Sequence, residues 1–334
     1  MRTLLFLVLA LAIRSATAAT EYKPLATIPI GGEGGWDIPA IDDAARRLYL
    51  PHADKVHVID LNTNKVIGSI TDTPGVHAFV AVPQLQRGFS SNGRENKVSV
   101  VDLKTLSTLK KLDAGANPDA IACDPKRNEV YVFNHSGNSV TVIDAKEAKP
   151  LATIPVGGSP EFAEVDSARG RVYVNLEDRS EVAVIDSAKR EVVARWSVAP
   201  GEQPTGLAYD AAHHRLFAAC HNKLLVMLDS ESGKLIGQIA IGSGVDGCVF
   251  DRVNQLVFAS CGEGLTFIAK ENSPDGLAVV QQLKTDRGAR TIALDPQTHR
   301  IYLPTADFGP PSSPDARPPI VPNTMRLLVY GPAE

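Results

Sequence analysis

Seven positions in this sequence, 40 to 44 residues apart, carry side chains that could bind one ligand together. Each lies five residues before a recurring turn position, and the set is Asp37, His77, Asp119, Glu161, Thr205, Asp246 and Arg290. If the fold brings them to one place, the carboxylates could hold a divalent cation or an amine-bearing ligand, with His77 nearby. The alternative is a polar, water-filled channel in which Arg290 pairs with one carboxylate. For a metal ion, the candidate ligands are Asp119, Glu161, Asp246 and His77.

A second group of polar residues is expected near the first, in the loops that follow the second strand of several repeats. Its members are His52, His135, Glu177, His221 and Glu263. Four imidazoles on one face, counting His77, would suit copper or zinc. No two of them have the close spacing of a compact ligand motif, so ordinary exposed loop histidines are the alternative. His213, His214 and His299 are expected in turns on the opposite face.

These positions belong to an internal repeat. Alternating apolar runs that end in Asp are spaced by 42 or 43 residues and cover residues 56–60, 98–102, 140–144, 182–186 and 225–229, with degenerate copies at 265–269 and 327–331. Upstream, an aromatic residue follows an Asp by seven residues, in the pairs Asp42/Tyr49, Asp124/Tyr131, Asp166/Tyr173, Asp210/Phe217, Asp251/Phe258 and Asp295/Tyr302. Runs with a period of two and no helical periodicity predict four short antiparallel strands in each repeat. Seven such units predict an all-β, seven-bladed β-propeller.

The two ends of the chain are expected to meet in the seventh blade. That blade lacks a fourth strand of its own, and residues 24–32 nearly duplicate residues 150–158, the outermost strand of the third blade. We therefore predict that an N-terminal strand closes the seventh blade. The same blade carries a Pro-rich insertion at residues 307–324. Its prolines favour an extended conformation, and it could cover the funnel, dock a partner or be a solvated loop.

Residues 1–19 have the pattern of a secretory signal peptide. Met1-Arg2 precedes an apolar run from Leu4 to Ile13 and a segment of small residues. We expect cleavage, a periplasmic or secreted location, and a single propeller domain at residues 20–334. Losing two of the 34 basic residues leaves 32 against 38 acidic ones, a net charge of −6 without a Lys/Arg run, which argues against nucleic-acid binding. No later segment is apolar for long enough to insert into a membrane.

The chain has four cysteines, Cys123, Cys220, Cys248 and Cys261. Neither CxxC nor CxxCH occurs, which excludes covalent c-type haem and thioredoxin-like chemistry. Cys123 and Cys248 occupy apolar strand positions. Cys220 and Cys261 hold equivalent places in neighbouring blades, where strands about 9 Å apart are too distant for an unstrained disulfide. We expect four free thiols.

The strand Tyr131-Val132-Phe133-Asn134, followed by the run at 140–144, resembles the YVTN-type seven-bladed β-propeller repeat family. The resemblance extends over essentially the whole chain after the signal segment. It implies the propeller fold and an exported or surface-located protein of bacterial or archaeal type. By analogy with the family alone, it also allows an accessory protein of exported redox enzymes. The Asn of the motif is kept at Asn92 and Asn134 and replaced in the other repeats.

The sequence as a whole predicts an exported, monomeric binding or scaffold protein that recognises a protein partner or a small ligand at the funnel mouth. A divalent cation is the candidate cofactor. The alternative is a metal-assisted hydrolase or lyase of lactonase type, in which the carboxylates hold the metal and His77, the candidate catalytic residue, is the general acid or base. Rigid blades that carry variable loops suit recognition without catalysis, which favours binding.

Overall fold

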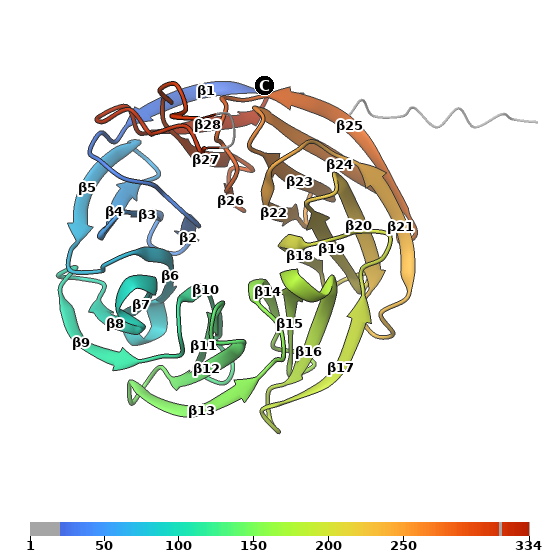
Figure 1. The fold of residues 1–334 in the computed structure, drawn as a ribbon, viewed down its shortest axis with the longest axis horizontal. Coiled ribbons are helices and arrows are strands. Elements are labelled where there is room, and N and C mark those ends of the chain that lie inside the picture. Colours follow the sequence, from blue (N-terminus) through green and yellow to red (C-terminus); the bar gives the residue numbers. More distant parts are fainter. Residues whose placement is uncertain (1–20, 314–315, 334) are drawn as a thin grey trace, which may run out of the picture.

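Seven four-stranded antiparallel sheets stand around a common axis as the blades of a propeller (Figure 1). This computed structural model describes residues 21–313 and 316–333. The seven-bladed, all-β fold expected from the repeat is confirmed. Helical structure in the described residues is limited to three short 3-10 turns, η1 (Pro83–Leu85), η2 (Gly93–Glu95) and η3 (Glu177–Arg179).

In blades 1 to 6 the strands follow chain order across each sheet, from the inner strand to the outer one. Blade 1 contains β2 (Ala40–Asp42), β3 (Arg47–His52), β4 (Lys55–Asp60) and β5 (Lys65–Ile70). Blade 2 contains β6 (Val76–Val82), β7 (Arg87–Asn92), β8 (Lys97–Asp102) and β9 (Thr108–Asp113). Blade 3 contains β10 (Pro118–Asp124), β11 (Glu129–Asn134), β12 (Ser139–Asp144) and β13 (Lys149–Pro155). Blade 4 contains β14 (Pro160–Asp166), β15 (Arg171–Leu176), β16 (Glu181–Asp186) and β17 (Glu191–Ser197).

Blades 5 and 6 repeat the pattern, and blade 7 departs from it. Blade 5 contains β18 (Pro204–Asp210), β19 (Arg215–Cys220), β20 (Leu224–Asp229) and β21 (Leu235–Ala240). Blade 6 contains β22 (Val245–Asp251), β23 (Leu256–Cys261), β24 (Leu265–Ser273) and β25 (Gly276–Lys284). Blade 7 contains β26 (Ala293–Leu294), β27 (Ile301–Thr305), β28 (Arg326–Pro332) and, as its outer strand, β1 (Tyr22–Pro29).

The core lies between neighbouring blades. Every residue of β11 is buried, whereas the outer strand β17 alternates between exposed and half-buried residues. The aromatic residues that follow an Asp by seven are all fully buried in second strands, as Tyr49, Tyr131, Tyr173, Phe217, Phe258 and Tyr302. Each fully buried aromatic side chain contributes about 1.5–3 kcal/mol through removal of its apolar surface from water. The repeat therefore encodes the packing of one blade on the next.

The recurring Asp ends the inner strand, or in blade 7 directly follows it, and shapes the turn to the second strand. In blade 4, for example, Asp166 Oδ1 accepts hydrogen bonds from the backbone N–H groups of Ala168 (3.1 Å) and Arg169 (3.0 Å). Side-chain acceptors of this kind are why Asp is favoured in turns. Blade 2 has Val82 at this position, and η1 makes the turn there, with Gln86 in the left-handed conformation. The fixed spacing from Asp to the buried aromatic residue is the turn together with the start of the second strand, since Tyr173 is the third residue of β15.

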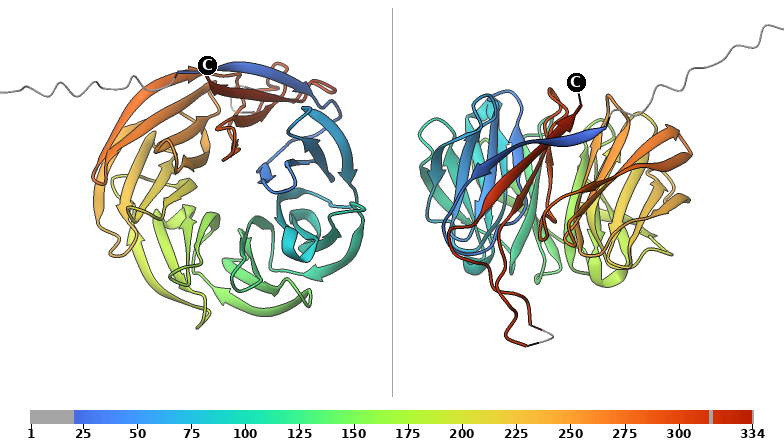
Figure 2. Two further views of the ribbon diagram at one scale, coloured as in Figure 1. Left: turned by 180° about the vertical axis from the view of Figure 1, so that it is seen from behind. Right: turned by 90° about the horizontal axis from the view of Figure 1, so that it is seen from above.

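Strand β1 closes the ring, as predicted from the duplicated segment. It pairs antiparallel with β28, from Tyr22 opposite Pro332 to Pro29 opposite Arg326. Figure 2 shows β1 along the outer edge of blade 7, beside the C-terminal strand. Sheet order is β1-β28-β27-β26, so segments from both ends of the described chain share one sheet.

Three other expectations concern the rest of the chain. The signal segment 1–19 lies outside the described residues. In the part that the structure describes, no helix is long and apolar enough to cross a bilayer. The four cysteines are unpaired, with Cys220, Cys248 and Cys261 buried and Cys123 half-buried.

Candidate ligand-binding site

The inner strands begin at one mouth of the propeller. His77, Asp119, Glu161, Thr205 and Asp246 are each the second residue of an inner strand, in β6, β10, β14, β18 and β22 respectively. Pairing with the second strand is interrupted at this point in all five blades, for example between Pro118 and Ile121. Such irregularities redirect side chains out of the regular ladder. Asp37 and Arg290 precede the shorter inner strands β2 and β26.

The seven positions converge on the axis. Six of them line one cavity of about 760 Å³, and the seventh, His77, contacts Asp37 at its edge. The cavity wall carries five carboxylates, Asp37, Asp119, Glu161, Glu177 and Asp246, and two guanidinium groups, Arg290 and Arg317. The excess of carboxylates makes this cavity attractive to positively charged ligands.

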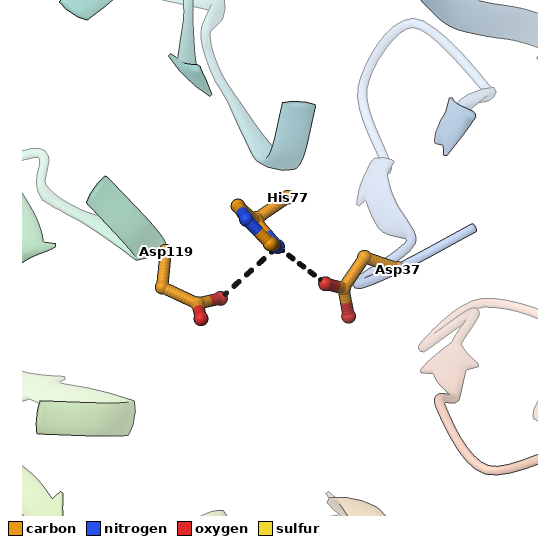
Figure 3. Close-up of side chains that lie close together, drawn as sticks. All are labelled: Asp37, His77 and Asp119. Atoms are coloured by element: carbon orange, nitrogen blue, oxygen red, sulfur yellow. Dashed lines mark hydrogen bonds and ion pairs between the residues drawn. The ribbon is translucent and has the colours of Figure 1, made fainter. Parts of the chain in front are cut away.

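His77 lies between two carboxylates. Its Nδ1 is 2.7 Å from Asp37 Oδ2 and 3.7 Å from Asp119 Oδ1 (Figure 3). Burial lowers the pKa of His77, but the hydrogen bond to Asp37 and the charges of both carboxylates outweigh burial and raise the pKa to about 9. His77 is therefore a cation at neutral pH and acts as a hydrogen-bond donor.

Arg290 neutralises one carboxylate, as the channel alternative anticipated. Its Nε donates a hydrogen bond to Asp246 Oδ2 at 2.8 Å, and its Nη2 donates to the carbonyl oxygen of Trp36 at 3.2 Å. The guanidinium carbon also lies 5.7 Å from the centre of the Trp36 ring, within the range of a cation–π contact. Asp246, the Trp36 carbonyl and the Trp36 ring thus hold Arg290 on the wall. Arg290 makes no direct ion pair with Asp119 or Glu161 among the described residues.

A second histidine, which follows β11 of blade 3, faces two carboxylates of the neighbouring blade 4. His135 Nε2 lies 3.2 Å from Glu161 Oε1 and 3.5 Å from Glu177 Oε2, and His221 Nδ1 lies 3.7 Å from Glu177 Oε1. Burial lowers the pKa of His135, which keeps the ring neutral. A buried, neutral nitrogen beside two carboxylates is the donor set of a divalent metal ion. His77 with Asp37 and Asp119 is a second group of one histidine and two carboxylates, although its histidine is protonated in the ligand-free protein.

Three of the crowded carboxyl groups have raised pKa values. Burial, with the charges of Asp119 and Asp246, raises the pKa of Glu161 to about 10. Burial and the charge of Asp37 raise the pKa of Asp119 to about 7 and that of Asp246 to about 6, although Arg290 acts in the opposite direction on both. Glu161 is therefore protonated at neutral pH. A bound cation would favour release of that proton.

Of the second group, Glu177 and His221 line the cavity, and His135 contacts Glu161 and Glu177 from outside the lining. The other two members lie away from the cavity. His52 was expected at the mouth, but it is 1% exposed and its Nδ1 lies 3.1 Å from His57 Nε2. A Cβ on Gly32 would lie 2.9 Å from the His52 ring, so the loop before β2 covers this side chain. Glu263 is exposed and accepts a hydrogen bond from Ser243 Oγ at 2.5 Å. Thr205 is in the wall, with its hydroxyl donated to the Val245 carbonyl at 3.2 Å.

Apolar wall residues were not anticipated from the sequence. Trp36 and Phe162 line the cavity beside the carboxylates. Trp36 pairs with His52 in an isolated β-bridge, which fixes the segment before β2 across the mouth. The one available signal was the position of Trp36, directly before Asp37 of the repeat register.

The Pro-rich insertion contributes from both of its arms. Phe308 and Ile320 form an antiparallel bridge, and both line the cavity together with Arg317 and Pro318. The Phe308 ring centre lies 6.2 Å from that of Trp36. Figure 2 shows the described residues of the insertion extending away from one face of the ring. Residues of the insertion therefore form part of the funnel wall.

Comparisons with known proteins agree with the fold. A family profile described as "YNCE-like beta-propeller" matches residues 36–168, and the match does not specifically support the YVTN-type repeat family. No curated protein matches the chain. Among solved structures, hydrazine synthase of Kuenenia stuttgartiensis is 16% identical with a TM-score of 0.70, covering 81% of this chain and 92% of that one. A chain of a structure titled "Crystal Structure of Mitotic Checkpoint Complex" is 12% identical with a TM-score of 0.77, covering 100% and 99%.

Proposed function

We propose that this protein is an exported binding protein that holds a positively charged ligand, a divalent cation or a small amine, in the acidic funnel. The observation that carries the proposal is the set of five carboxylates in the wall of one cavity, against two arginines. Burial, together with the charges of the neighbouring carboxylates, raises the pKa of Glu161 to about 10. The carboxylates repel one another in the ligand-free protein. A positive ligand removes this repulsion, and the free energy released strengthens binding.

The state of His77 argues against its use as a general base. A general base must be unprotonated at the working pH, whereas the pKa of His77 is raised to about 9 by its two carboxylates despite the opposing effect of burial. A protonated His77 holds Asp37 and Asp119 in place and offsets part of their negative charge. This arrangement supports the binding protein rather than a hydrolase with His77 as the base.

A direct test measures binding calorimetrically, with Ca²⁺, Mn²⁺, Zn²⁺ and putrescine as separate probes. We expect one of these cations to bind, and the double variant Asp119→Asn/Glu161→Gln to weaken that binding by about tenfold or more, because each lost charge-assisted contact contributes about 1.5–3 kcal/mol. Glu263→Gln is the matched control, since it makes the same change at an exposed site outside the cavity. If none of the four probes binds, or if the double variant binds as tightly as the parent chain, the funnel proposal fails.

The insertion supports recognition by supplying part of the wall. Replacing residues 308–322 with a short Gly-Ser linker is expected to speed ligand dissociation about tenfold, because Phe308 and Ile320 no longer close one side of the cavity. Stopped-flow displacement of the bound probe gives this rate. Ser312→Ala is the control, since Ser312 is an exposed residue of the insertion that does not line the cavity. Unchanged dissociation in the linker variant would leave the insertion as a solvated loop or a docking strip for a protein partner.

A further inference from the structure

A second cluster of ligating side chains lies on the face opposite the funnel, between blades 5 and 6. Asp210 ends β18 and His213 lies in the turn that follows, while Glu271 comes from the end of β24 in the next blade. His213 Nδ1 is 2.7 Å from Asp210 Oδ2 and 3.3 Å from Glu271 Oε2. The three groups can each offer one ligand atom within 4.8 Å of the others.

The internal repeat shows which part of this cluster is unusual. The backbone N–H of Glu271 donates to the Gln255 carbonyl, as the corresponding N–H donates to the preceding turn in other blades. The residues at this equivalent position are Leu61, Leu103, Ala145, Ser187 and Ser230. The fold therefore accepts an apolar or small side chain at this position. The carboxylate of Glu271 has no counterpart in the other five blades, so blade packing does not require it.

Burial leaves this carboxylate incompletely satisfied. The Glu271 side chain is 0% exposed, and its second oxygen, Oε1, is buried without a hydrogen-bond partner among the described residues. Buried polar atoms in native proteins are almost always partnered, and a missing ion or water is a standard explanation for an exception. Arg215, the nearby cation of the turn, is occupied by Asp229 at 2.9 Å and Asp275 at 2.8 Å. His213 is 28% exposed at the side chain, which leaves an entry path.

We propose that Asp210, His213 and Glu271 bind a divalent transition-metal ion, with zinc as the probe, at a site separate from the funnel. One imidazole nitrogen and two carboxylate oxygens are ligands that Zn²⁺ accepts, with water completing the coordination. The ion takes the place of the His213 proton between the two carboxylates and gives Glu271 the partner that it lacks. Because the ligands come from two blades, the ion ties blade 5 to blade 6.

The test uses the whole protein, which is stripped of metal with a chelator and titrated calorimetrically with Zn²⁺. It is carried out in the parent chain and in the Asp119→Asn/Glu161→Gln background, so that failure of the funnel proposal and failure of this one are separate results. We expect one Zn²⁺ to bind in the background variant, and this binding to be lost in Glu271→Leu and His213→Gln. Leu stands at the equivalent position in blades 1 and 2, so the Glu271→Leu variant keeps a side chain that the repeat tolerates.

His299→Gln is the matched control on the same face. His299 Nδ1 contacts Asp251 Oδ2 at 2.8 Å, a His–Asp pair of the same kind without a third ligand group among the described residues. We expect this variant to bind Zn²⁺ like its background chain. Retention of binding in both Glu271→Leu and His213→Gln, or absence of binding in the background variant, overturns the proposal. In that case, the cluster is a protonated histidine held between two carboxylates.

Discussion

Deleting residues 21–29 is expected to abolish the cooperative melting of the propeller. The deletion removes strand β1 and with it Tyr22 and Ile28, which are 2% and 3% exposed. Tyr22 packs on Phe258 of blade 6 with ring centres 5.0 Å apart and donates its hydroxyl to the His299 carbonyl at 2.8 Å, whereas Ile28 packs within the core between blades 7 and 1. The strand therefore joins blade 7 to both of its neighbours.

The expected loss is comparable to the whole stability of an ordinary domain. Two buried large side chains contribute about 1.5–3 kcal/mol each, and the lost hydrogen bonds to β28 add about 1 kcal/mol apiece, against a typical total of about 5–15 kcal/mol. The deletion also leaves β28 as an open edge, which promotes association between chains. Circular dichroism during heating and size-exclusion chromatography measure the two effects.

Point variants in β1 test the same prediction even if the deleted chain cannot be produced. Tyr22→Ala should cost about 3–5 kcal/mol, in line with other buried aromatic truncations, and Leu25→Ser, at a position that is 42% exposed, should cost less than about 1 kcal/mol. A peptide of residues 21–30 added to the deleted chain is expected to restore the cooperative transition. A deleted chain that melts like the parent would show that blade 7 is stable with three strands.

The fold could be predicted from the sequence because each repeat encodes its own packing. The Asp that makes the first turn and the aromatic residue that fills the space between blades stand a fixed distance apart, so the register carries from one blade to the next. That register also located the residues of the funnel: Asp119 and Glu161 occupy the same place in neighbouring blades, and closing the ring brings them to one cavity. Their pairing with ligands remains a prediction.

Features that break the repeat could not be predicted in the same way. His52 stands at a mouth position, but the loop containing Gly32, with a φ of +85°, folds back over it and buries it. Trp36 becomes a wall residue through contacts with Arg290, 254 residues away. Glu271 meets His213 across a gap of 58 residues between different blades. A Glu where other repeats have Leu, Ala or Ser was the available signal for the last of these.

The free energy of unfolding of the ligand-free protein is expected to fall as the pH rises from about 7 to about 9. The groups that face one another in the funnel are Asp37, His77, Asp119, His135, Glu161, Glu177, His221, Asp246, Arg290 and Arg317. Burial and neighbouring carboxylates raise the pKa of Glu161 to about 10 and that of Asp119 to about 7, and the two carboxylates beside His77 raise its pKa to about 9 in spite of burial.

The sign follows from proton binding. All three pKa values are raised, so the folded protein holds protons that the unfolded chain has released at the same pH, and stability falls with rising pH. For His77 the stabilisation is complete below its unfolded pKa and is lost as the pH passes through about 9. For Glu161 the penalty begins above the unfolded pKa of a glutamate and grows up to about pH 10. The lowered pKa values of His52, His57 and His135, where burial is the largest cause, affect stability below this window.

Glu161→Gln isolates the largest of these contributions. The amide has the shape of the protonated carboxyl group and cannot ionise, so at about pH 9 the variant should be more stable than the parent by about 1–3 kcal/mol, whereas at about pH 4 the two should be nearly equal. Urea unfolding at a series of pH values measures both differences, and Glu263→Gln, whose carboxyl pKa is lowered by its hydrogen bonds to Ser243, should show no such gain. If the funnel binds a cation, a saturating concentration of that cation should remove the stability advantage of the variant, because the cation stabilises the ionised carboxylate of Glu161 in the parent. An equal gain at both pH values would mean that the variant improves packing, and that Glu161 is not held protonated by its neighbours.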